Sequence, residues 1–310
     1  MIRILLLMAG AVLLFIQHYI YPLSVQLQVT SFLCGIILLG IPHGAADLLV
    51  ATQNSTAQTK SFSPAKFFIK YLGRLILFAT LFWFFPLAAN LIFIVFAAYH
   101  FGETDLHQFK TNTLPGKSFV ISYGLLVLGV ILLNHFEEVK PLFMQFEAGI
   151  KYESFIDHIG LYRYTILSFI AVLFFSSAFF YFSVNNNNDQ QGKFLVQFAV
   201  ILFILYNLPM IVGFTFYFVL WHSVLSLRNI VKYLRKDGLF STMVISKQLA
   251  FYSLLAIAGI GLFGLTGFMF ISNNAMMVYV FLGLAVLTAP HMEVMHGMYS
   301  SMRDRSRTQK

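Results

Sequence analysis

The sequence predicts an all-α fold: a polytopic membrane helix bundle of about ten transmembrane helices, with both termini in the cytoplasm. Apolar residues make up 59% of the chain and charged residues 10%, and 36 of its 310 residues are Phe. A water-soluble domain could not bury that much apolar surface. Apolar runs long enough to cross a bilayer recur along the chain, and the basic residues gather on one side of the resulting topology. We therefore expect residues 1–310 to form a single multi-pass domain of the cell (inner) membrane.

The candidate spans come from windows of about 20 residues, the length of helix that crosses the hydrocarbon core of a bilayer. They lie at roughly 2–20, 27–50, 67–85, 87–106, 118–135, 161–184, 194–209, 211–231, 248–272 and 276–298. The first is expected to be a retained span, because no small-residue cleavage site clearly follows it. Pro86 and Pro209 predict two tight turns, since proline ends one helix and suits the first turn of the next.

The basic residues support this arrangement of spans. With a cytoplasmic N-terminus, all of the 20 Lys and Arg residues lie on the cytoplasmic side except Lys140, Lys151 and Arg163, as the positive-inside rule requires. Topology therefore explains the net charge of +8, and no nucleic-acid partner is expected. Cys34 is the only cysteine, which excludes an internal disulfide and any cysteine-built metal or iron–sulfur site.

The histidines fall into two groups. Five of the nine lie at span ends or in the outer loop, where histidine is usually an amphipathic residue at a wet boundary: His18, His107, His135, His158 and His296. The other four, His43, His100, His222 and His291, lie inside the second, fourth, eighth and tenth spans, all of which run inward. Each follows roughly 11 to 16 residues of its span, which places the four within about 8 Å of one another in depth.

Four histidines at one depth favour a shared ligand. A lone intramembrane histidine can hydrogen-bond a serine or a carbonyl group on a neighbouring helix, but ionisable groups in lipid are costly and are candidates for function. A transition metal such as iron, copper or zinc would satisfy several imidazoles at once, as in other helical bundles. The alternative is a proton relay, which usually has carboxylates at mid-depth. Here the nearby carboxylates lie at most a turn beyond the histidines: Asp47, Glu103, Asp105 and Glu293.

Two of these carboxylates fit a supporting role. Asp47 is four residues after His43 and Glu103 is three after His100, so each can share a helix face with its histidine and approach a ring N–H. They can equally be helix-end residues that enter the interface. Pro42 and Pro290 directly precede two of the histidines, and each proline predicts a loosened helix beside a cavity.

Four blocks of sequence carry a family resemblance. They are PHGAAD at 42–47, AYHFGETD at 98–105, WHS at 221–223 and PHM at 290–292. In this order they resemble the signature blocks of the Brp/Blh family, the bacterial and archaeal membrane beta-carotene 15,15'-dioxygenases that make retinal for microbial rhodopsins. The resemblance covers most of the chain. It implies an Fe(2+) centre held by histidines, with His43, His100 and His222 at ligand positions.

One position departs from the family pattern. The family usually has a second histidine four residues after that of WHS, and here that position is Ser226. A hydroxyl is a poor substitute for imidazole as an iron ligand. Either the fourth contact comes from elsewhere, with His291 best placed by depth, or the iron site is altered or absent.

The resemblance implies oxidative cleavage of a conjugated double bond by O2. The substrate would be an apolar carotenoid that enters from the bilayer, and the product suggests a functional link to a microbial rhodopsin. The side chains that flank the histidines in sequence are the first expected to contact this substrate: Tyr99, Phe101, Trp221 and Met292. The protein would hold the polyene at the metal and exclude water.

Three hypotheses for the function remain open. The first is the iron-dependent oxygenase. The second is a diverged family member that acts on another isoprenoid, or binds a retinoid without central cleavage, as Ser226 suggests. The third is a haem-binding electron carrier with paired axial histidines on facing helices. A transporter is less favoured, because the weak similarity between HGAAD and HFGETD is the only sign of an inverted repeat in the sequence.

Overall fold

The computed structural model describes the chain except for residues 58–60, 146–149, 186–187, 237–239, 269–275 and 309–310, and it leaves out most side chains of 260–280 and those of 304–308. The described residues form helices and short connections, and no strand occurs among them. The structure therefore confirms the predicted all-α fold.

The N-terminal half contains helices and two short π-helical segments, labelled η. They are α1 (Ile2–Phe15), η1 (Ile16–Ile20), α2 (Val25–Gly35), η2 (Ile36–Gly40), α3 (Ile41–Gly44), α4 (Asp47–Ala57), α5 (Pro64–Phe84), α6 (Pro86–Asp105), α7 (Leu114–Leu133), α8 (Phe136–Phe143) and α10 (Glu153–Leu161). The C-terminal half contains α11 (Arg163–Val184), α12 (Asn188–Asn207), α13 (Met210–Phe214), η3 (Thr215–Ser223), α14 (Val224–Arg235), α15 (Thr242–Phe268) and α16 (Met276–Thr308).

Eight helical segments of the described chain are long and apolar enough to cross a membrane. They are Ile2–Ile20, Val25–Thr56, Pro64–Phe84, Pro86–Asp105, Leu114–Leu133, Arg163–Val184, Met210–Arg235 and Thr242–Gly259. Of the other two predicted spans, 194–209 lies in α12 except for its last two residues, and 276–298 lies within α16. The predicted turns occur where expected, because α6 begins at Pro86 and Pro209 is the residue before α13.

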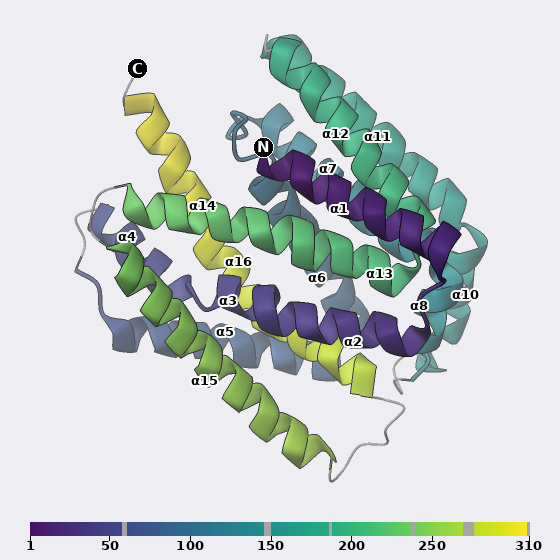
Figure 1. Cartoon of the computed structure of the whole chain (residues 1–310), viewed down its shortest axis with the longest axis horizontal. Helices are drawn as coiled ribbons and strands as arrows, with labels where there is room; N and C mark the ends of the chain where they lie inside the picture. The colour runs from purple at the N-terminus through teal and green to yellow at the C-terminus, as the bar shows by residue number, and fades with distance from the viewer. Residues whose placement is uncertain (58–60, 146–149, 186–187, 237–239, 269–275, 309–310) are drawn as a thin grey trace.

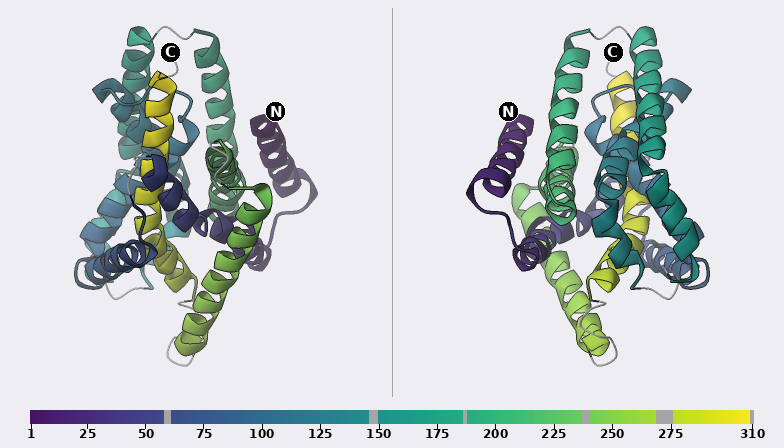
Figure 2. Two further views of the ribbon diagram at one scale, coloured as in Figure 1. Left: turned by 90° about the vertical axis from the view of Figure 1, so that its left-hand side faces the viewer. Right: turned by 90° about the vertical axis from the view of Figure 1, so that its right-hand side faces the viewer.

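α2, α5 and α14 run roughly along the long axis of the molecule, which is horizontal in Figure 1, and α11, α12, α15 and α16 cross it obliquely. Both termini lie in the upper left part of Figure 1, and α8 and α10 lie at its right-hand edge. The side views show α1 and α15 at the periphery of the bundle (Figure 2). This arrangement agrees with termini on one side of a membrane, and the cytoplasmic assignment of that side stays a prediction.

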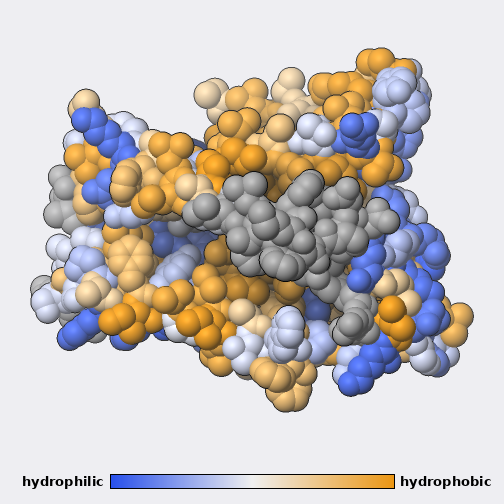
Figure 3. All heavy atoms as spheres, turned by 90° about the horizontal axis from the view of Figure 1, so that it is seen from below, coloured by the Kyte–Doolittle hydropathy of each residue, from blue (hydrophilic) through white to orange (hydrophobic). Residues whose placement is uncertain are grey.

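The surface has the character expected of a protein embedded in lipid. On the face seen in Figure 3, hydrophobic residues cover much of the surface between the left and right ends, and hydrophilic residues gather toward those two ends. Large apolar side chains are widely exposed, for example Leu38 at 70%, Trp83 at 82% and Phe179 at 70%. Apolar exposure on this scale marks a surface that contacts lipid rather than water.

Three of the four intramembrane histidines lie in irregular helices. The π-helical segment η2 ends at Gly40, two residues before Pro42, and a turn at residues 45–46 follows His43. η3 carries His222, and α16 has Pro290 inside it directly before His291. Such π-helical stretches are rare, and they frequently occur at functional sites.

The fourth histidine, His100, lies on an uninterrupted α-helix, α6, that packs very closely against its neighbour. α6 and α7 approach so closely at Gly102 that a Cβ atom there would lie 2.0 Å from the backbone oxygen of Val120. At Gly124 a Cβ atom would lie 1.9 Å from the backbone oxygen of Ala98. Small residues allow this approach, as is usual between helices in membranes, and the contact fixes α6 and therefore His100.

Candidate functional site

The structure brings the four intramembrane histidines together in the interior. His43 comes from α3, His100 from α6, His222 from η3 and His291 from α16. The ring centroid of His43 lies 5.7 Å from that of His222 and 4.9 Å from that of His291. The ring of His100 lies 4.8 Å from His222 and 5.3 Å from His291. Each ring therefore contacts two of the other three, and the four form a closed cluster.

The cluster is buried, and five of its eight ring nitrogens lack a hydrogen-bond partner. The four residues are between 0% and 5% exposed. Neither ring nitrogen of His100 or His222 has a hydrogen-bond partner, and neither does Nε2 of His291. His43 Nδ1 lies 3.4 Å from the backbone oxygen of Leu39. Because a buried polar atom without a partner costs about 1–3 kcal/mol, these nitrogens point to a group that binds them.

A transition metal fits the spacing of these rings. Imidazole nitrogen binds such metals at about 2.1 Å, so two rings on one ion at cis or tetrahedral angles have centroids about 4.5–5.3 Å apart. The observed separations of 4.8–5.7 Å match or slightly exceed this range. Within the described chain, no group of three or more His, Cys, Asp or Glu side chains is already arranged to hold a metal ion. Small ring rotations would have to bring the nitrogens to a common point.

The same spacing disfavours a haem. Axial imidazoles of a haem bind on opposite faces of a flat macrocycle. Four rings that each contact two of the others leave no room between them for such a plane, so the arrangement suits a single small ion.

Asp47 supports the cluster, but through a different histidine from the one expected. Its Oδ1 lies 2.7 Å from Nδ1 of His291, and its Oδ2 accepts a hydrogen bond from the Tyr71 hydroxyl at 3.0 Å. The predicted pairing with His43 is wrong, because the helix is interrupted at residues 45–46 and the spacing of four residues no longer puts both side chains on one face. The carboxylate holds the ring of His291 with its Nε2 free.

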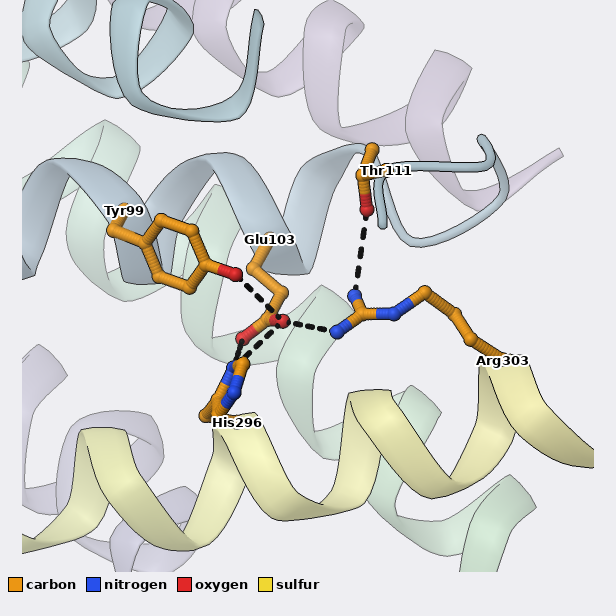
Figure 4. Close-up of polar contacts among 5 residues, drawn as sticks. All are labelled: Tyr99, Glu103, Thr111, His296 and Arg303. Atoms are coloured by element: carbon orange, nitrogen blue, oxygen red, sulfur yellow. Dashed lines mark hydrogen bonds and ion pairs between the residues drawn. The ribbon is translucent and has the colours of Figure 1, made fainter. Parts of the chain in front are cut away.

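Glu103 also binds a different partner from the expected one. Its carboxylate lies 3.0 Å from Nδ1 of His296 and accepts a hydrogen bond from Nη2 of Arg303 at 2.7 Å, both from α16 (Figure 4). The predicted contact with His100 is not made, because this buried carboxylate instead has a guanidinium as its partner. His296, interpreted from sequence as an ordinary interface residue, therefore helps to fix α16 against α6. The sequence signal that could have predicted this contact is the spacing of His296 and Arg303, which lie a whole number of helical turns apart and so share one face of the helix.

The predicted substrate-contact residues separate into different roles. Phe101 packs against His222 with ring centroids 4.7 Å apart. Tyr99 contacts Glu103 and the ring of His296, and the Trp221 indole donates a hydrogen bond to a carboxylate of α6. Met292, the residue after His291, is buried. Of these four side chains, Phe101 is the one shown to contact a ring of the cluster.

Near His222, the sequence did not predict the contact of Phe218 and left the role of Ser226 open. Phe218 lies one turn earlier on η3 and stacks on His222, with centroids 6.1 Å apart. Its position four residues before the histidine was the available signal. Ser226, at the position of the usual family histidine, is fully buried on α14. His291 completes the four-ring cluster.

These observations define a polytopic membrane protein with a buried four-histidine centre. The family model described as beta-carotene 15,15'-dioxygenase matches residues 34–299, so the chain belongs to this family. A relative named "Beta-carotene 15,15'-dioxygenase", from an uncultured marine bacterium 66A03, is 25% identical over 263 residues, which cover 83% of this chain and 89% of the relative. No solved structure matches the chain.

Proposed function

We propose that this chain, in the inner membrane, cleaves beta-carotene at its central double bond with O2 and releases two molecules of retinal. One Fe(2+) ion would be held by the four clustered histidines: His43, His100, His222 and His291. The observation that carries the proposal is the closed cluster of buried imidazoles, in which several ring nitrogens have no hydrogen-bond partner.

Family membership and the donor set support the choice of reaction and metal. Neutral imidazole is a suitable ligand for iron, and the cluster contributes no anionic ligand. When bound, the ion would supply the redox chemistry that combines O2 with the double bond. One C=C bond and one O2 become two C=O groups, and no proton is gained or lost. The chain therefore needs no acid or base for the overall balance.

The role of the protein is to orient the rings, to exclude water and to receive an apolar rod. Asp47 orients His291 through the contact at 2.7 Å. Phe101 and Phe218 provide apolar walls beside His222. At Gly44, the residue after His43, a Cβ atom would meet no atom within 4 Å, which leaves open space on that face of α3. Apolar walls and adjacent space suit a polyene that enters from the bilayer.

Expression in bacteria that accumulate beta-carotene tests the reaction. We expect loss of the orange colour and formation of two equivalents of retinal, with about one non-haem iron per purified chain and no Soret band. Unchanged colour in well-expressed, iron-loaded protein would refute central cleavage of this substrate. Retinal supplied in this way would suit a microbial rhodopsin in the same cell.

Single substitutions test the centre. His43→Ala, His100→Ala, His222→Ala and His291→Ala should each abolish iron binding or activity, because each removes one of the clustered rings. His158→Ala is the matched control, since this histidine is exposed in α10 and belongs to no part of the cluster. If His291→Ala binds iron and cleaves as well as the unmodified chain, His291 is not a ligand.

Ser226 motivates a second candidate, a family member that binds a retinoid or another isoprenoid without central cleavage. The observation in its favour is the buried serine at the usual histidine position. Ser226→His should raise activity only if this position still faces the metal. Retinal bound by the unmodified protein with no cleavage in the carotene-accumulating cells would favour the second candidate over the first.

A further inference from the structure

A buried carboxylate, Asp105, joins three helical elements beside the histidine cluster. It is the last residue of α6 and is 1% exposed. Its Oδ2 accepts hydrogen bonds from the Tyr123 hydroxyl of α7 at 2.6 Å and the Tyr217 hydroxyl of η3 at 2.9 Å. The same oxygen accepts a third, at 2.9 Å, from the indole N–H of Trp221. The proposed metal centre makes no direct use of this carboxylate.

Two of the three donors lie on the segment that carries His222. Trp221 directly precedes His222, and Tyr217 lies on the same π-helical stretch. The ring of Phe101 contacts both Tyr217, at 5.3 Å, and His222, at 4.7 Å. A long π-helical stretch is unfavourable by itself, so hydrogen bonds from outside the segment help to hold it in this form.

The first helix of the chain contacts the same assembly. Nη2 of Arg3 donates a hydrogen bond to the backbone oxygen of Asp105 at 2.6 Å, and the guanidinium carbon lies 5.9 Å from the centre of the Trp221 ring. Arg3 precedes the segment matched by the family model. A cation beside a buried carboxylate offsets part of the cost of burying its charge.

We propose that Asp105 is a positioning residue for His222. Through Trp221 and Tyr217 it holds η3 in the π-helical form that turns the His222 ring toward His43 and His100. Its action on the metal is indirect, because no contact joins the carboxylate to any of the four rings. This inference rests on the proposed function for its metal readout and also has a readout that needs no metal.

The competing explanation is that Asp105 only stabilises the packing of α6, α7 and η3 against one another. A purely stabilising contact would change the stability of the fold alone, whereas a positioning residue changes the arrangement of the histidine rings in molecules that remain folded. A matched control is Ser122→Ala, which removes a buried hydrogen bond of 2.6 Å between the hydroxyls of Ser122 in α7 and Ser177 in α11. That bond contacts neither η3 nor the cluster.

The first experiment titrates the purified full-length chain with Co2+, whose visible absorption reports the ligands around the ion. Asp105→Ala and Asp105→Asn should lose about tenfold or more in Co2+ affinity, as supporting contacts of metal ligands typically do. Ser122→Ala should keep its Co2+ affinity even if its thermal unfolding temperature falls as far as that of the Asp105 variants. If Asp105→Ala does not fold, Asp105→Asn decides the matter, because it keeps the shape of the side chain and one acceptor oxygen.

The second experiment follows η3 directly in metal-free protein. The chain has two tryptophans, and Trp83 is 82% exposed, so Trp83→Phe leaves Trp221 as the sole tryptophan, which can be excited selectively over tyrosine. In this background, Asp105→Asn should shift the Trp221 emission. It should also speed modification of His222 by diethylpyrocarbonate, measured on the isolated peptide, because this histidine is otherwise fully buried.

The outcomes separate the two proposals. Loss of Co2+ affinity in both Asp105 variants, together with the spectral shift, supports the positioning role. If Asp105→Asn folds with unchanged Co2+ affinity, or if affinity falls equally in Ser122→Ala, the positioning role is overturned. If the unmodified chain binds neither Co2+ nor iron, the proposed function fails. The rate of His222 modification then decides the role of Asp105, and an unchanged rate overturns it.

Discussion

The contact between α6 and α7 makes Gly102→Ala a sharp test of how the bundle positions His100. The added Cβ atom would lie 2.0 Å from the backbone oxygen of Val120 and 2.8 Å from its carbonyl carbon. Both atoms belong to the backbone of a packed helix, so no side-chain rotation can relieve the overlap. Gly102 and His100 lie on the same helix with one residue, Phe101, between them.

The size of the effect follows from the distances. Ordinary contact begins at about 3.4 Å, so the two helices must separate locally by about 1.4 Å. Overpacking of this kind costs about 1–3 kcal/mol, and backbone atoms on one side of the clash favour the upper end of that range. A shift of this size in α6 also carries His100 away from the other rings, and we expect Co2+ affinity to fall by about tenfold or more.

The assay compares thermal unfolding in detergent and Co2+ titration for Gly102→Ala and a control. Gly73→Ala is the matched control, because Gly73 lies in α5 and a Cβ atom there would meet no atom within 4 Å. That variant should be neutral or more stable by up to about 1 kcal/mol, since alanine is the better helix former. Equal stability and metal affinity in the two variants would refute the close packing that we describe.

Three further predictions concern the polar contacts. Asp47→Ala should lower Co2+ affinity by about 10- to 100-fold, because His291 loses the acceptor for its Nδ1 atom; metal titration measures this. Arg303→Met should destabilise the fold by about 2–3 kcal/mol in denaturant unfolding, somewhat below the usual cost of breaking a buried ion pair, since Glu103 keeps a histidine contact. Burial lowers the pKa of His107 to about 4, so its proton is bound more weakly in the folded state, and stability should fall by about 2 kcal/mol between pH 7.5 and pH 5.

Each of these predictions has a control. Unchanged metal affinity in Asp47→Ala would remove the orienting role of that carboxylate. If Glu103→Gln combined with Arg303→Met is no more stable than Arg303→Met alone, the unpaired charge is not the source of the loss. The folded pKa of His107 lies below the usual 6.5, so stability is present above pH 6.5 and is lost as the pH falls toward 4. His107→Gln should flatten that dependence, and an equally steep loss in this variant would contradict the assignment.

Hydropathy predicted much of the fold because each span is a local property of the chain. The span predicted at 67–85 is observed as Pro64–Phe84, and the one at 87–106 as Pro86–Asp105. The π-helical segments η2 and η3 were not predicted, since they depend on tertiary contacts that hold an unfavourable backbone. The sequence also contains no periodicity that distinguishes a short π-helical stretch from an α-helix.

The site could be predicted in part, for a related reason. A common depth in the membrane depends only on topology, and the four histidines that share it are the four that meet. The partners of the carboxylates depend on contacts between helices. Asp47 reaches a histidine 244 residues away, and Glu103 reaches His296 across 193 residues. Spacing along one helix reports only neighbours on that helix, so both partners were assigned to the wrong histidine.

The origin of His291 in the last helix has a consequence for the order of events during synthesis. Asp47 and His291 are 244 residues apart, so at about 5–20 residues per second the ribosome completes the pair roughly 10–50 s after the first member emerges. Until then the nascent chain holds its earlier intramembrane histidines and their carboxylate without the ring that closes the cluster. Assembly of the centre is therefore a late, post-insertion event, and a chain interrupted before α16 would be a membrane protein without a finished site.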